Sequence, residues 1–71
     1  MYKDLIKEKV TVVVSSRANY VFEYTGTLVA EDDSTIKLEN VDIAYLYIGF
    51  KYETGLEEVI INKRYIISCD K

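Results

Sequence analysis

The amino-acid sequence predicts an all-β protein: a small, strongly bent five-stranded antiparallel barrel with a short N-terminal α-helix. Residues 24–38 read as a strand, an acidic turn and the start of a second strand. Gly26 lies in the middle of the first of these strands, where a glycine usually marks a sharp bend or the close approach of another backbone. Alternation of apolar and polar residues is typical of a half-buried strand. It places four side chains on one face: Phe22, Tyr24, Leu28 and Ala30.

The length and composition predict one domain, residues 1–71, that requires a source of stability beyond its own hydrophobic core. A core of this size is marginal without disulfides, a metal or oligomerisation. Cys69 is the single cysteine and there is no histidine, which excludes an internal disulfide and argues against a zinc site. We therefore expect the chain to associate with copies of itself. Cysteine poverty, and the lack of a signal peptide or an apolar span, predict a cytoplasmic protein with no membrane partner.

The net charge of −3 and the isoelectric point of about 4.8 describe an acidic chain. Proteins that bind nucleic acid through bulk electrostatics are basic, because neutralising phosphates supplies much of their affinity. The balance of charge counts against strong nucleic-acid binding, and leaves room only for a local site.

The N-terminal residues 1–8 are expected to form a short amphipathic helix. Its apolar residues recur at helical spacing: Tyr2, Leu5 and Ile6. A helix of this length is unstable alone, so it must pack on the barrel. It either plugs an open barrel end or also presents Lys3 and Lys7 on one face of an assembly.

The strands follow from runs of β-branched and aromatic residues separated by turn residues. The expected strands are residues 10–15, 20–31, 36–52, 56–61 and 65–69, with a loop at residues 16–19. The first strand should point Val10, Val12 and Val14 inward. We expect the third strand to be interrupted by a bend or bulge at residues 40–42, and the turn at Glu53, Thr54 and Gly55 to join it to the fourth.

The last two strands carry consecutive apolar residues, so both faces of each strand need cover. A single small sheet has one interior, and exposed apolar edge strands pair readily with another chain. Strand addition of this head-to-tail kind closes into a ring where the rotation permits. The predicted subunit interface is Val59, Ile60, Ile61, Tyr65, Ile66 and Ile67.

Gly26, Leu28 and Asp32 match the first half of the first Sm motif: a glycine, a hydrophobic residue two positions later and an aspartate four beyond that. The chain resembles an Sm-like protein of the LSm/Hfq superfamily over nearly its whole length. The resemblance implies an Sm-like barrel in which the fourth strand of one subunit joins the fifth of the next. It also implies single-stranded RNA as a partner, bound at the pore of a ring.

The resemblance places the RNA contacts in two loops, one before the third strand and one between the last two strands. The corresponding residues are Ser34, Thr35, Asn62, Lys63 and Arg64. They depart from the family pattern at every position that touches a base: Thr35 can still form a hydrogen bond, while Ser34 offers no stacking surface. Lys63 and Arg64 would give each pore loop two cations. A plain polar turn is the alternative interpretation of residues 62–64.

Nothing in the sequence favours catalysis, so we do not expect an enzyme, a cofactor or a metal site. There is no histidine to act in acid–base chemistry or to activate Cys69. The acids at residues 31–33 are typical of a solvated turn. Tyr45, Tyr47 and Tyr52 could stack on bases, although packing in a core or interface is the commoner role. The alternatives to RNA binding are a structural or protein-interaction ring, and a domain within a larger hetero-complex.

Overall fold

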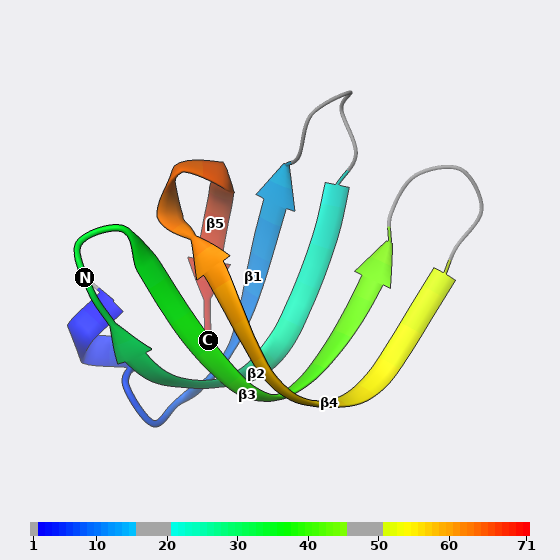
Figure 1. Ribbon diagram of the computed structural model, residues 1–71, viewed down its shortest axis with the longest axis horizontal. Helices are drawn as coiled ribbons and strands as arrows, with labels where there is room; N and C mark the ends of the chain where they lie inside the picture. The colour runs from blue at the N-terminus through cyan, green and yellow to red at the C-terminus, as the bar shows by residue number, and fades with distance from the viewer. Residues whose placement is uncertain (1, 16–20, 46–50) are drawn as a thin grey trace.

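The computed structural model describes residues 2–15, 21–45 and 51–71 and shows one antiparallel five-stranded sheet. The strand order is β4-β3-β2-β1-β5. Figure 1 shows that β2, β3 and β4 are long and curl strongly across the molecule. The elements are η1 (Tyr2–Leu5), β1 (Lys9–Ser15), β2 (Val21–Glu31), β3 (Thr35–Tyr45), β4 (Lys51–Asn62), η3 (Lys63–Tyr65) and β5 (Ile66–Asp70). The all-β prediction with five antiparallel strands is confirmed.

The N-terminal segment is a 3₁₀ turn over Tyr2–Leu5, so the expected α-helix is wrong. Lys7 ends the segment with φ of 72°, in the left-handed region. Its N–H donates to the carbonyl of Leu28 at 2.7 Å, and the N–H of Leu28 donates to the carbonyl of Glu8 at 3.0 Å. These tertiary hydrogen bonds to β2 take the place of a second helical turn, which a segment this short could not sustain.

Gly26 lies where the backbone of β3 comes close to β2. A Cβ at this position would lie 2.9 Å from the carbonyl oxygen of Glu39 and 3.0 Å from a methyl carbon of Val41. The register of β2 on β3 shifts at the same point, and Asn40 of β3 has φ of 54°. The extra residue on β3 is a bulge, which increases the local bend. Both expectations, a close approach at Gly26 and a bulge near Asn40, are confirmed.

The predicted turn at residues 53–55 is wrong. These residues lie inside β4, and β3 continues through its bulge to Tyr45. Gly55 has φ of 72° at a second register shift, and its N–H donates to the carboxylate of Asp42 at 3.3 Å. A left-handed glycine therefore serves a bulge here, although it is equally typical of a hairpin turn. Residues 46–50, between the two strands, and the predicted loop at residues 16–19 lie outside the described residues.

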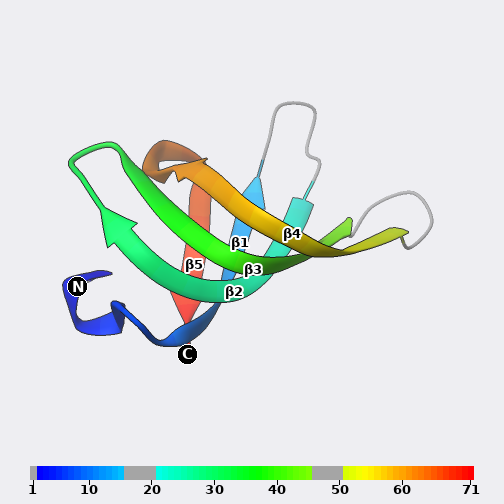
Figure 2. The ribbon, with the colours of Figure 1, turned by 60° about the horizontal axis from the view of Figure 1, so that its bottom comes forward.

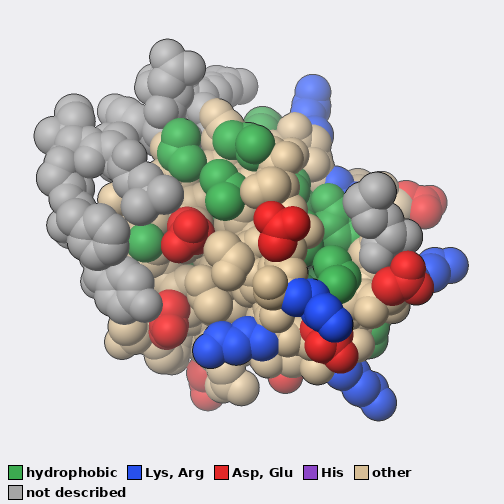
Figure 3. Space-filling model, turned by 180° about the vertical axis from the view of Figure 1, so that it is seen from behind, with side chains coloured by type: hydrophobic (Ala, Val, Ile, Leu, Met, Phe, Trp, Pro, Cys, Tyr) green, Lys and Arg blue, Asp and Glu red, His purple; other side chains and the backbone are tan. Residues whose placement is uncertain are grey.

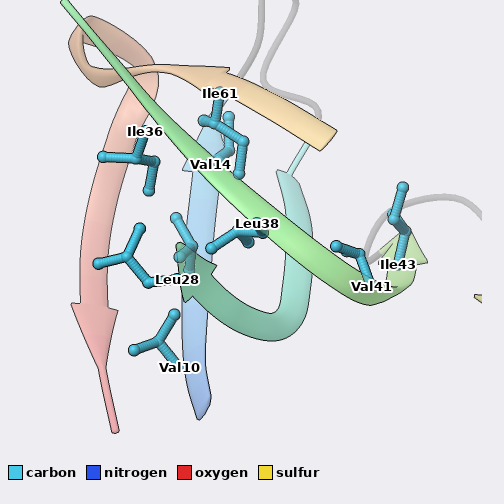
Figure 4. Close-up of a cluster of buried hydrophobic side chains, with 9 residues drawn as sticks. Val10, Val14, Leu28, Ile36, Leu38, Val41, Ile43 and Ile61 are labelled. Atoms are coloured by element: carbon cyan, nitrogen blue, oxygen red, sulfur yellow. The ribbon is translucent and has the colours of Figure 1, made fainter. Parts of the chain in front are cut away.

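The core lies in the concave side of the curled sheet (Figure 4). The predicted inward set of β1, Val10, Val12 and Val14, is buried. Ala30 differs from prediction: it is exposed, because an extra residue on β2 shifts the register between Leu28 and Ala30. The buried cluster consists of Val10, Val12, Val14, Leu28, Ile36, Leu38, Val41, Ile43 and Ile61, with Tyr2, Leu5 and Ile6 of the N-terminal segment packed against it.

The two ends of the strand order, β4 and β5, are the edges of the sheet. The short β5 pairs with β1, and β4 pairs with β3. In the described residues no helix has both the length and the apolar character needed to cross a membrane.

Candidate functional site

Two connections meet at one end of the sheet, the turn between β2 and β3 and the turn formed by η3 (Figure 2). Thr35 stands opposite Asn62 in the register of β3 on β4. The N–H of Lys63 donates to the carbonyl of Ser34 at 2.8 Å. The structure thus brings together the residues that the resemblance assigned to RNA: Ser34, Thr35, Asn62, Lys63 and Arg64. We call residues 31–35 and 62–65 together the loop cluster.

Asp32 builds the first turn of the loop cluster. One carboxylate oxygen, Oδ1, accepts the N–H of Ser34 at 2.8 Å, the N–H of Thr35 at 2.7 Å and the Thr35 hydroxyl at 3.1 Å. The backbone hydrogen bonds from Ser34 and Thr35, followed by the Thr35 hydroxyl, hold the pKa of Asp32 below its usual 3.8. Because the Thr35 hydroxyl already donates to Asp32, it can accept a hydrogen bond from a base but has no further proton to give.

Asn62 shapes the second turn of the loop cluster. Its side-chain Oδ1 accepts the N–H of Arg64 at 3.0 Å and so caps η3. Asparagine commonly satisfies backbone donors at such positions, and here Asn62 fixes the backbone of Arg64, while the N–H of Lys63 donates to the carbonyl of Ser34. The amide nitrogen of Asn62 remains the part of this side chain that can face a ligand.

Lys63 is tied into its own chain. Its Nζ lies 2.7 Å from Oε2 of Glu31 and 5.1 Å from the centre of the Tyr2 ring. The Lys63 side chain is 23% exposed and the Glu31 side chain 16%, so the ion pair is largely withdrawn from water. The charge of Lys63 is therefore neutralised within one chain, and the turn at residues 62–64 does not carry the two free cations that the sequence suggested.

Arg64 differs from Lys63 in its surroundings. It is exposed, and its guanidinium carbon lies 5.8 Å from the centre of the exposed Tyr65 ring. A guanidinium beside an aromatic face offers both a charge for phosphate and a flat surface for a base.

The net charge of the loop cluster is not positive. Glu31, Asp32 and Asp33 outnumber Lys63 and Arg64. Figure 3 shows the same mixture on one face of the molecule, where acidic and basic side chains of the described residues are interspersed. Any attraction of the loop cluster for an anion must therefore come from single side chains, because the net charge of the cluster is not positive.

The predicted subunit interface divides into three groups. Ile60 is 63% exposed, Ile67 62% and Tyr65 43%. Val59 and Ile66 are half-buried against the core. Ile61 is buried inside the chain, opposite Ile36, and its assignment to the interface surface is wrong, because alternation along β4 turns it inward when Ile60 faces out.

The exposed isoleucines belong to opposite edges of the sheet. Ile60 lies on β4, and Ile67 lies on β5 where the pairing with β1 skips from Ser68 to Ile66. A shallow hollow of about 350 Å³ adjoins Ile60; its other lining residues are Ala30, Glu31, Asp32, Thr35 and Lys37. Its lining combines the apolar side chains of Ala30 and Ile60 with charged ones, so the hollow has both apolar and charged surface.

Tyr45 is the one tyrosine, of the three considered for base stacking, whose side chain the structure describes. Its ring packs edge-on against Phe22 with centres 5.1 Å apart, and its hydroxyl donates to the Glu53 carboxylate. Both contacts lie within one sheet, which agrees with packing rather than base stacking. Tyr47 and the side chain of Tyr52 lie outside the described residues.

Cys69 is half-buried on β5. Burial, and secondly the neighbouring Asp70 carboxylate, raise the pKa of its thiol. Both influences disfavour the thiolate, which is the reactive form.

Sequence reasoning missed the roles of Glu31 and Tyr2. Glu31 was assigned to a solvated turn and Tyr2 to a barrel plug, whereas both contact Lys63. No periodic pattern connects residues so far apart in sequence, so only the fold could pair them.

No protein-family model matches the chain, and a search of curated proteins finds no match either.

Proposed function

We propose that this chain is an Sm-like protein of the cytoplasm that forms a homo-oligomeric ring through its β4 and β5 edges. The proposed ligand is single-stranded RNA, bound weakly at the loop cluster. One observation carries the proposal: each edge of the sheet exposes an isoleucine, Ile60 on β4 and Ile67 on β5. Edge strands with exposed apolar side chains are templates for pairing with another chain.

Two different edges favour a head-to-tail contact over a two-fold one. A two-fold contact uses the same patch twice, and would leave the other edge of each copy open. Pairing of β4 with β5 of the next copy uses both edges at every contact. Repetition of that contact around an axis closes a ring and leaves no edge uncovered.

The edge contact is tested by Ile60→Asp and Ile67→Asp. Each places an unpaired charge between strands, so each variant should lose the parental assembly and scatter light as a smaller species. Lys9→Asp is the control, because Lys9 is an exposed residue of the interior strand β1. Circular dichroism checks that the variants keep their sheet. If both isoleucine variants hold the parental mass, the edges do not form the contact.

RNA binding is tested by fluorescence anisotropy with short uridine-rich and adenine-rich oligonucleotides. We expect weak binding that falls steeply as salt is added, because phosphate contacts release counterions. A titration that shows no binding at low ionic strength removes the RNA proposal.

The second candidate is a structural or protein-interaction ring without RNA binding. The pairing of Lys63 with Glu31 favours it, because this contact removes one of the two cations of the turn. An intact ring that binds no oligonucleotide at low salt would select this candidate. Native mass spectrometry with and without RNA reads both properties in one measurement.

A further inference from the structure

Lys63 contacts three separate parts of the chain at once. Its backbone N–H donates to Ser34 in the turn between β2 and β3. Its Nζ pairs with Glu31 at the end of β2 and lies over the ring of Tyr2 in η1. A side chain that joins the N-terminal segment to the end of the sheet restricts how that segment can move.

The energetics favour this arrangement over release of Lys63 to a ligand. The ion pair is mostly removed from water, so screening by salt is weak and Coulomb attraction is stronger than at the surface. The ammonium over the Tyr2 ring adds a cation–π attraction. Pulling Lys63 away would leave the carboxylate of Glu31, whose side chain is 16% exposed, without its partner.

Arg64 has no ion pair comparable to that of Lys63 with Glu31 among the described residues. The salt bridges of the described chain are Lys37–Glu58, Lys63–Glu31 and Lys71–Glu8, so Arg64 lacks a carboxylate partner there. Its backbone is held by Asn62, and its neighbour Tyr65 presents an exposed ring. The backbone of Arg64 is thus fixed by Asn62, while the side chain that carries its guanidinium is exposed.

We propose that Lys63 is a positioning residue that holds η1 against the end of the sheet, and that Arg64 is the cation of this turn that contacts RNA phosphate. The first part stands on the contacts within one chain. The second part rests on the proposed function. Two neighbouring basic residues then have separate tasks, one inside the subunit and one toward the ligand.

The positioning role is tested by amide hydrogen exchange in Lys63→Met and Arg64→Met, matched changes that keep an aliphatic stem and remove the charge. The reporters are the amides of Lys7 and Leu28, which join the N-terminal segment to β2. Lys63→Met should speed their exchange about fivefold or more through local opening, and Arg64→Met should not. Lys63→Arg, which keeps the charge, should restore most of the protection. Equal exchange in Lys63→Met and the parent overturns the positioning role.

The ligand role is tested by the salt dependence of RNA affinity in the same variants. Arg64→Met should lower the slope of log K against log salt by about one for each subunit in contact. Lys63→Met should leave the slope unchanged. A reduced slope in Lys63→Met, without faster exchange at Lys7, would make Lys63 the phosphate contact and overturn the proposal. If the parent binds no RNA, the proposed function and the Arg64 assignment fall together, while hydrogen exchange still decides the role of Lys63.

Discussion

The ammonium of Lys63 lies 2.7 Å from the carboxylate of Glu31, a residue 32 positions away that ends strand β2. Through this contact a residue of the expected RNA-binding turn becomes part of the chain's own folded structure. It also places the N-terminal segment, through Tyr2, beside the loop cluster. The two halves of the loop cluster are therefore held together by side chains as well as by the pairing of β3 with β4.

We expect the Glu31–Lys63 pair to contribute about 1 kcal/mol to folding, at the upper end of the range for surface pairs because both side chains are mostly buried. A double-mutant cycle with Glu31→Gln, Lys63→Met and the double variant measures the coupling by urea denaturation. The exposed pair Lys37–Glu58, 3.1 Å apart, is the comparison and should couple more weakly. Additive effects at Glu31 and Lys63 would contradict the prediction.

Gly26→Ala should destabilise the fold by about 2 kcal/mol, because the new methyl group would lie 2.9 Å from the rigid carbonyl of Glu39. Gly55→Ala is a useful contrast. No atom lies within 4 Å of a Cβ there, but φ of 72° costs an alanine about 1 kcal/mol.

Asparagine tolerates the left-handed region, so Gly55→Asn should be milder than Gly55→Ala. Gly26→Asn, by contrast, should be at least as harmful as Gly26→Ala, since the obstacle at Gly26 is space. Urea midpoints distinguish the two kinds of glycine. A Gly26→Ala variant as stable as the parent would show that β3 can move away from the new methyl group at little cost.

The stability of the fold should depend on pH through the carboxyl group of Asp32. Its folded pKa is depressed, so the hydrogen-bonded carboxylate stabilises the fold fully above the usual pKa of 3.8. That contribution is lost as the pH falls through the lower folded pKa. The difference in urea midpoint between the parent and Asp32→Asn should therefore be largest at neutral pH and shrink below pH 3.8. The neighbouring exposed position, changed as Asp33→Asn, is the control. A difference that is constant with pH would mean that the carboxylate charge has no part in the turn.

The thiol of Cys69 should react slowly with iodoacetamide at mildly alkaline pH, several-fold slower than a short peptide thiol, because its raised pKa leaves less thiolate. Denaturation in urea should remove the difference. Asp70→Asn should increase the rate modestly, since the Asp70 charge is the smaller of the two influences on the Cys69 pKa. A rate in the native protein equal to that of the peptide would contradict the raised pKa.

The sequence by itself determined the inward face of β1 and the position at which another backbone approaches β2. Alternation predicted that Val10, Val12 and Val14 point inward, because side chains in a strand alternate with a period of two. Gly26 could be singled out because a glycine inside a strand is costly unless a backbone approaches it. The apolar excess in the last two strands predicted exposed isoleucines on the edges, and Ile60 and Ile67 are exposed.

The tertiary structure alone decided the features that depend on distant partners. A left-handed glycine serves a hairpin or a bulge equally well, so only the pairing with Asp42 shows that Gly55 belongs to β4. The N-terminal segment became a single 3₁₀ turn because hydrogen bonds to β2 replace those of a helix. The contact of Lys63 with Glu31 arises because a curled sheet brings the end of β2 beside η3. Local patterns describe one strand at a time, whereas these contacts require all the strands to be in place.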